Sequence, residues 1–276
     1  MFFNDFLRVL LSDFLRVLLS DFLRVTFKRC FLISSGIAFL ACFVSGVSQA
    51  QPSITADILV EKIDAFRGLD NAGFSFDITN VSYKAGRDAR TNQLSVDVKA
   101  VKSLVTFESP ARQKGRVLLK QDNDMWLYIP GTRKVIRISP AQRLLGETSN
   151  GDVTGSNLAL DYDATLSTEE SDKPQGQIKL ILTAKNKSVS YQKVVFWLEE
   201  KAPYKPIRSE YYARSGKLLK TADYKAFKDF NGELKIHKML LTDPLIEGSY
   251  TWMLFDNYRT TDLPDARFSK EAIVNL

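Results

Sequence analysis

The hydrophobic residues between positions 53 and 66 recur with the spacing of an α-helix. Ser53 stands in front of them and can cap the amino end of such a helix, and Gly68 follows its carboxyl end. The apolar positions are Ile54, Ile58, Leu59, Ile63 and Phe66. The sequence therefore predicts a helix over 53–66 with one apolar face.

From Phe74 onward the pattern changes, because hydrophobic and polar residues alternate and turn signals recur at short intervals. We expect roughly eleven strands joined as antiparallel hairpins, since no strand–helix–strand rhythm appears. The polar stretch 85–92 is expected to be the first turn. Residues 139–164 predict a long loop with one or two short helices, and a short helix is predicted near 269–275.

Several of these predicted strands are apolar on both faces. In the stretch 125–129, Met125, Leu127 and Ile129 alternate with Trp126 and Tyr128, and 194–198 and 250–255 behave in the same way. A half-exposed antiparallel sheet would carry polar residues on one face. A strongly curved sheet, with helices packed into its concave side or with an apolar cavity there, accounts for the pattern.

The amino-terminal 50 residues have the character of a targeting segment. Residues 1–24 contain the octapeptide DFLRVLLS repeated, and 25–50 have a basic start, an uncharged apolar run and small residues before a cleavage site after Ala50. An uncleaved anchor and a lipoprotein signal at Cys42 are the alternatives. No linker rich in Pro, Gly or Ser divides the rest, so we expect one domain over 51–276.

Composition narrows the possible functions. The 276 residues are 45% hydrophobic and 25% charged, and the net charge is +6, without a basic block interleaved with aromatics that would favour nucleic acid. Beyond residue 50 there is no cysteine, and His237 is the one histidine of the chain. Metal and cofactor sites and an enzymatic function are therefore not expected, and no nucleophile or phosphate-loop motif is present.

The most distinctive stretch is 124–138, DMWLYIPGTRKVIRI, which predicts two strands joined at Pro130. It presents Trp126 and Tyr128 with Arg133 and Arg137 nearby. One interpretation is a hairpin with a solvated basic edge. The other is a basic rim beside an apolar pocket, suited to an amphiphile with an acidic head group.

This hairpin, together with the targeting segment and the stretch GDVTGSNLALDY at 151–162, resembles the outer-membrane lipoprotein-sorting family, in its LolA-like branch. The matching positions are Trp126, Tyr128, Pro130, Arg133, Arg137 and Ile138. Asn157 and Leu158 depart from the Gly-Ser-Asp-Phe-like segment of that branch. We assign no residue of this chain to the functional arginine of the family's carrier.

The resemblance implies a mainly β (α+β) fold, an incomplete antiparallel β-barrel whose apolar concave face is covered by helices. It implies a periplasmic carrier that shields acyl chains of lipoproteins or other lipids for transfer towards the outer membrane, with an inner-membrane transporter or exporter as a possible partner. Trp126, Tyr128, Trp197 and Trp252 are the expected wall residues of the cavity, with Pro130, Arg133 and Arg137 at its rim. The alternative is a non-carrier subunit of an envelope export complex.

Overall fold

The computed structural model describes residues 54–68, 73–122, 124–155, 157–169 and 174–275, and these fall in one compact unit. The predicted targeting segment, including Ala50, lies outside the described residues. None of the described helices is long and apolar enough to cross a membrane.

Helix α2 covers Ala56–Phe66, close to the predicted bounds. Its cap is Thr55, whose hydroxyl oxygen accepts a hydrogen bond from the backbone N–H of Ile58 at 3.3 Å. The predicted cap, Ser53, lies outside the described residues. The apolar face of the helix, formed mainly by Leu59 and Ile63, is fully buried.

Thirteen strands form one antiparallel sheet in the order β6-β5-β4-β3-β2-β1-β15-β14-β13-β12-β11-β10-β9. Each half of the sheet is a run of hairpins, and the pairing of β1 with β15 joins the halves. In the described residues β6 and β9 do not pair with each other, so the sheet stays open. The first half comprises β1 (Phe74–Lys84), β2 (Arg87–Lys99), β3 (Lys102–Ser109), β4 (Val117–Gln121), β5 (Asp124–Ile129) and β6 (Lys134–Ile138). The second comprises β9 (Tyr162–Leu166), β10 (Gln177–Ala184), β11 (Lys193–Glu199), β12 (Pro206–Tyr212), β13 (Leu218–Phe230), β14 (Glu233–Thr242) and β15 (Tyr250–Thr260).

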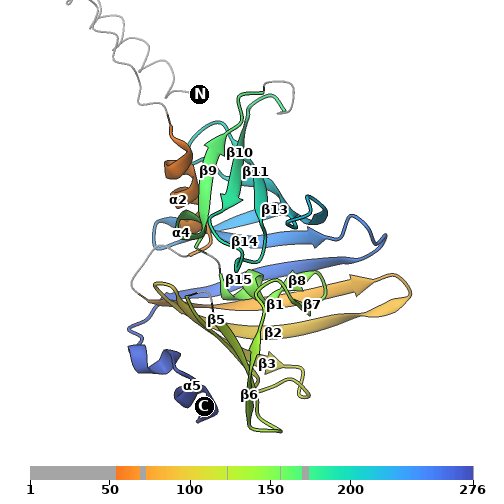
Figure 1. Cartoon of the computed structure of the whole chain (residues 1–276), viewed down its shortest axis with the longest axis vertical. Helices are drawn as coiled ribbons and strands as arrows, with labels where there is room; N and C mark the ends of the chain where they lie inside the picture. The colour runs from red at the N-terminus through yellow and green to blue at the C-terminus, as the bar shows by residue number, and fades with distance from the viewer. Residues whose placement is uncertain (1–53, 69–72, 123, 156, 170–173, 276) are drawn as a thin grey trace, which may run out of the picture. The chain divides into compact units, whose positions relative to one another are not determined.

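The sheet is curved, and the segment between its halves packs against its concave face (Figure 1). This segment contains the hairpin β7 (Arg143–Leu145) and β8 (Thr148–Ser149), helix α3 (Asn150–Thr154) and helix α4 (Leu158–Asp161). Helix α2 contacts α4, β9 and β14, while α3 contacts β2, β3 and β4. The main hydrophobic core lies between these helices and the sheet.

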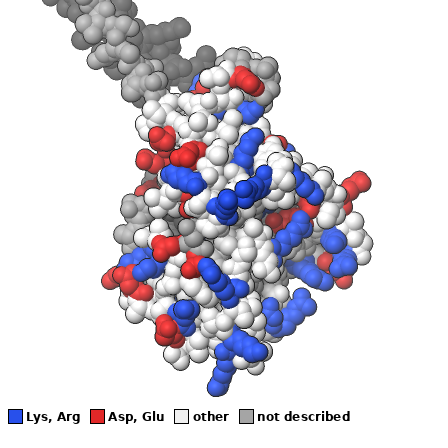
Figure 2. Space-filling model, in the orientation of Figure 1, with Lys and Arg blue, Asp and Glu red and all other residues white. Residues whose placement is uncertain are grey.

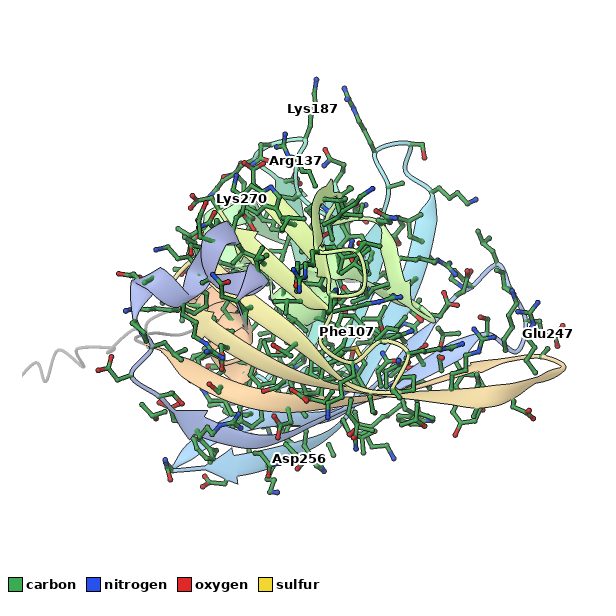
Figure 3. The ribbon with its side chains drawn as sticks, turned by 90° about the horizontal axis from the view of Figure 1, so that it is seen from below. Phe107, Arg137, Lys187, Glu247, Asp256 and Lys270 are labelled. Atoms are coloured by element: carbon green, nitrogen blue, oxygen red, sulfur yellow. The ribbon has the colours of Figure 1, made fainter. Side chains whose placement is uncertain are left out.

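A second, smaller core lies on the outer face of the sheet. The helices η2 (Asp265–Phe268) and α5 (Lys270–Val274) cover β3–β5 there, and Phe268 and Ile273 are fully buried. Figure 3 shows this part of the chain near the labelled Lys270. Helices η2 and α5 therefore cover apolar side chains on the outer face of these strands. This explains why the stretch 125–129 is apolar on both faces.

The predicted fold class is confirmed: the protein is mainly β, with a large open antiparallel sheet and few helices. The structure differs from the predictions at the start of β2 and at β9. Strand β2 begins at Arg87 inside the expected turn 85–92, because the end of this hairpin extends beyond the core and needs no apolar side chains. Strand β9 lies partly in the stretch 139–164, which the sequence predicts as a loop with short helices: Tyr162, Ala164 and Leu166 alternate with polar residues, but these five residues directly follow the helical stretch at Leu158–Asp161.

Candidate functional site

The concave face encloses a cavity of about 50 Å³ between the sheet and the ends of α2 and α3. Most of its lining is apolar or aromatic and comes from strands of both halves of the sheet. Arg67 and Asp152 supply a polar end. The sheet-side lining consists of Phe76, Val98, Tyr211, Tyr224, Ile236, Met239, Leu241, Phe255 and Tyr258.

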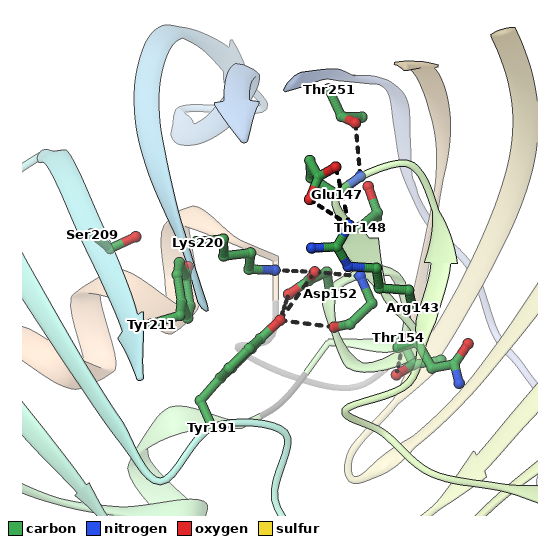
Figure 4. A network of polar contacts seen from close by, with 12 residues as sticks. Arg143, Glu147, Thr148, Asp152, Thr154, Tyr191, Ser209, Tyr211, Lys220 and Thr251 are labelled. Carbon is green, nitrogen blue, oxygen red and sulfur yellow. Dashed lines mark hydrogen bonds and ion pairs between the residues drawn. The ribbon is translucent and has the colours of Figure 1, made fainter. Parts of the chain in front are cut away.

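A buried ion pair borders this cavity. The ammonium group of Lys220 on β13 donates to the carboxylate of Asp152, and both side chains are less than a tenth exposed. The Lys220 nitrogen also lies 4.8 Å from the ring centroids of Tyr191 and of Tyr211. Figure 4 shows the lysine reaching Asp152 beside these two aromatic side chains.

The short helix α3 holds Asp152 in place. Its N-cap is Ser149, whose backbone N–H donates to the Asp152 carboxylate at 2.7 Å in a capping box. The Tyr191 hydroxyl donates to the other carboxylate oxygen at 3.1 Å. Burial lowers the pKa of Lys220, and the Asp152 carboxylate partly opposes this shift. The pair is therefore a fully engaged structural link between α3 and the sheet.

Next to this pair, Arg143 on β7 joins two further carboxylates. Its guanidinium lies 2.6 Å from Asp243 and 3.0 Å from Glu147. Ser249 donates to Glu147 at 2.6 Å, and the Glu147 backbone N–H donates to Thr251 at 3.0 Å. These contacts tie the β7–β8 hairpin to the β14–β15 loop and to β15, and Figure 4 shows Arg143, Glu147 and Thr251.

The carboxyl end of α2 contributes a second buried acid. Asp64 is 4% exposed, lies 3.1 Å from the Arg67 guanidinium and accepts the backbone N–H of Ala159 at 3.0 Å. Burial raises the pKa of Asp64, although Arg67 lowers it in part. The Asp64 carboxylate therefore links α2 to α4, and it positions Arg67 at the cavity.

The tryptophans and the tyrosine predicted to line the cavity lie elsewhere. Trp126 and Tyr128 pack in the outer core beneath η2 and α5, on the face opposite the cavity. Trp197 pairs with Lys179 and is half-buried, next to the inward-facing Phe196. Trp252 lies on the outer face, where the Lys238 nitrogen is 4.3 Å from its ring centroid. Contact of these four side chains with a ligand stays a prediction.

The predicted basic rim is an exposed hairpin turn. Pro130 and Arg133 belong to the turn between β5 and β6, and Arg133 has a positive φ of 53°. Arg137 is exposed and pairs with Asp124 across the hairpin. Neither arginine lines the cavity, and their role at a ligand stays a prediction.

Sequence reasoning did not find the residues that meet at the cavity. Asp152 and Lys220 are 68 positions apart, and neither belongs to a motif with a recognised spacing. The available signal was a lysine within the apolar alternation of 218–227, where a charged residue at a core-facing position requires a partner. Among the described residues no group of three or more His, Cys, Asp or Glu side chains is placed to hold a metal ion.

The fold and the helix-covered cavity define a LolA-like protein. A LolA superfamily protein from Nitrosomonas europaea is similar over 79% of this chain and 99% of its own, with 29% identity and a TM-score of 0.73. A DUF1329 family protein from Desulfovibrio piger is 26% identical over 79% of this chain and 97% of its own, with a TM-score of 0.66. A domain assigned to the outer membrane lipoprotein-sorting proteins, from Vibrio parahaemolyticus, has 24% identity, a TM-score of 0.66 and coverage of 80% and 98%.

A family model described only as "Uncharacterized protein" matches residues 99–275, and the chain belongs to that family. The resemblance to LolA-like lipoprotein-sorting proteins is thus confirmed at the level of the fold and the superfamily. No curated protein matches the sequence.

Proposed function

We propose that this protein is a periplasmic carrier that binds the acyl chains of lipoproteins or other lipids on its concave face, for transfer towards the outer membrane. The observation that carries the proposal is the cavity under α2 and α3, which has an apolar sheet-side lining and a polar end formed by Arg67 and Asp152. Apolar walls with a few convergent polar groups are typical of sites for amphiphiles.

The cavity must enlarge before it can hold an acyl chain. Its volume of about 50 Å³ is enough for a few water molecules, whereas ligand pockets begin at roughly 300 Å³. Helix α2 is the covering element whose movement would open the concave face, because its apolar face is the side packed on the core. Each CH₂ group of an acyl chain that is buried on binding contributes about 0.8 kcal/mol. Burial of a whole acyl chain therefore offsets the free-energy cost of exposing the apolar face of α2.

The comparisons support a carrier over an enzyme, since the similar solved structures include LolA superfamily and lipoprotein-sorting proteins. Export by the segment 25–50, cleavage after Ala50 and a transporter partner in the inner membrane are parts of the proposal that rest on the sequence and on this likeness.

The test is a pair of neighbouring substitutions on β14. Met239 lines the cavity, while Leu240 faces the opposite side and pairs with Trp252. In Met239→Trp the larger ring fills the cavity, and we expect binding of a fatty acid with an anthroyloxy fluorophore to weaken about tenfold. Leu240→Trp, the matched control, is expected to bind as the unsubstituted protein does.

Lipid extraction gives the complementary measurement. The protein purified from periplasm under mild conditions is expected to release phospholipid or lipoprotein acyl chains, identified by mass spectrometry. If neither endogenous lipid nor the fluorescent fatty acid binds, the carrier proposal fails and the non-carrier subunit of an export complex is the better interpretation.

A further inference from the structure

A second concave site lies at one end of the sheet and shares no lining residue with the cavity. This basic groove, of about 290 Å³, is formed by the β1–β2 hairpin, the β3–β4 loop, the β7–β8 hairpin and the β14–β15 loop. Its basic lining residues are Lys84, Arg87, Arg90, Arg112 and Arg143. Figure 2 shows Lys and Arg gathered towards the right of the view, where Figure 1 places the end of the β1–β2 hairpin.

A β-bulge brings two of these arginines to the same side of the hairpin. Arg87 pairs with Lys84 and Arg90 pairs with Ser82, and the register shifts between Ser82 and Lys84. Without the bulge, arginines three positions apart would point to opposite faces of the strand. With it, Lys84, Arg87 and Arg90 all line the groove.

The floor of the groove is fixed by specific contacts. The buried Asn92 side chain donates to Gln113 at 2.7 Å, which holds the β3–β4 loop and hence Arg112 against the hairpin. Gly146, with a φ of 57°, brings the β7–β8 turn so close to Ser82 that an added Cβ would lie 2.5 Å from the serine Cβ. The basic side chains therefore project from a rigid frame.

Four of the five basic side chains in the groove have no ion-pair partner among the described residues. Arg143 is engaged by Asp243 and Glu147, but within the described part of the chain Lys84, Arg87, Arg90 and Arg112 have no ion-pair partner. Asp88 and Glu147 are the carboxylates of the lining, and Glu147 is bound by Arg143 and Ser249. Figure 3 shows Glu247 on the β14–β15 loop, next to the end of the β1–β2 hairpin.

We propose that this groove binds a phosphate-bearing ligand, with Arg87, Arg90 and Arg112 as its main contacts. Several guanidinium groups around one concavity suit the oxygens of a phosphate better than isolated lysines do, because each can donate two parallel hydrogen bonds. The same chemistry fits the head group of an anionic lipid or a soluble phosphate compound. The proposal is independent of the carrier function, since the cavity is a separate site.

The test compares two double variants that remove the same charge. Arg87→Gln with Arg112→Gln removes two exposed groove arginines, whereas Arg214→Gln with Lys217→Gln removes two exposed charges of the β12–β13 turn. Binding of pyrophosphate is measured by calorimetry, and binding to vesicles of phosphatidylglycerol, with phosphatidylcholine as reference, by cosedimentation. The groove variant is expected to bind about tenfold more weakly to the ligand that the unsubstituted protein binds, and the control within about twofold.

The two probes separate the sources of the phosphate. Groove-dependent binding to phosphatidylglycerol vesicles alone assigns a lipid head group, and groove-dependent binding of pyrophosphate, with or without vesicles, assigns a site that accepts soluble phosphate. Absence of binding to both probes, or an equal loss in the control variant, overturns the proposal. Met239→Trp is expected to retain groove binding, so failure of the carrier proposal would leave this result unchanged.

Discussion

The Lys220 ammonium group is paired with the Asp152 carboxylate on the concave face, and the two residues come from β13 and from the helix α3 that packs against the other half of the sheet. Each side chain is less than a tenth exposed, so water would not solvate either charge if the other residue of the pair were removed. This pair therefore holds together two parts of the fold that are far apart in the sequence.

Removing one residue of this buried ion pair should destabilise the folded protein. Asp152→Ala leaves the Lys220 charge buried without its carboxylate, and we expect the free energy of unfolding, measured in urea, to fall by about 3–5 kcal/mol. Adding Lys220→Met should restore part of the loss, because the apolar chain fits the same space. Arg137→Gln, which breaks the exposed pair with Asp124, should cost less than about 1 kcal/mol. Equal effects for the buried and the exposed pair would contradict this account.

Stability should fall steeply at alkaline pH. Burial raises the pKa values of Tyr162, Tyr191, Tyr211, Tyr224 and Tyr258 above their ordinary value of 10.0. Above pH 10 these phenols ionise in the unfolded chain but not in the folded one. The stability that they contribute is therefore complete below pH 10 and is lost as the pH rises towards their folded pKa values.

The tyrosine prediction is tested with Tyr162→Phe. This variant loses the hydrogen bond from the Tyr162 hydroxyl to the Tyr191 carbonyl oxygen, worth about 1 kcal/mol. Its unfolding free energy should decline above pH 10 less steeply than that of the unsubstituted protein, by up to about 1.4 kcal/mol per pH unit. Denaturant titrations across this range measure both slopes, and identical slopes would exclude Tyr162 from the effect.

Two glycines with similar backbone angles should respond differently to substitution. Gly86 and Gly146 have φ values of 70° and 57°, so alanine costs backbone strain of about 1–2 kcal/mol at either position. At Gly86 the added Cβ meets nothing within 4 Å, whereas at Gly146 it meets Ser82 and Thr251. Gly146→Ala should therefore destabilise the protein clearly more in thermal unfolding, and a ranking in the opposite order would show that the close approach is not limiting.

The C-terminal helices should stabilise the outer face of the sheet. Phe268 is 1% exposed and packs with Tyr128 and Trp126, so Phe268→Ala should lower the unfolding free energy by about 3–5 kcal/mol. Val274, which is 40% exposed on the neighbouring helix α5, is the control, and Val274→Ala should have less than a third of that effect. Equal losses for the two variants would mean that the burial of Phe268 in the outer core does not account for its effect.

The hairpin at 124–138 shows how far sequence reasoning reached. Its strands, its turn at Pro130 and its likeness to LolA-like proteins were predicted, and the structure places β5 and β6 there. The face of the hairpin was not predictable. Alternation shows that Trp126 and Leu127 point to opposite sides, but both sides are apolar, and only the packing of η2 and α5 shows that Trp126 is on the outer side.

The sequence by itself determined the mainly antiparallel sheet, the first helix and the family likeness, because period-two and helical spacings are local properties that tertiary packing here reinforces. The tertiary structure decided which side chains meet: Asp152 with Lys220, Arg143 with Asp243, and the arginines of the basic groove. These groups come from strands and loops that are brought together by the β1–β15 pairing and by the segment between the two halves of the sheet. No local pattern encodes such contacts, because strand order and sheet curvature set the distances between residues far apart in the chain.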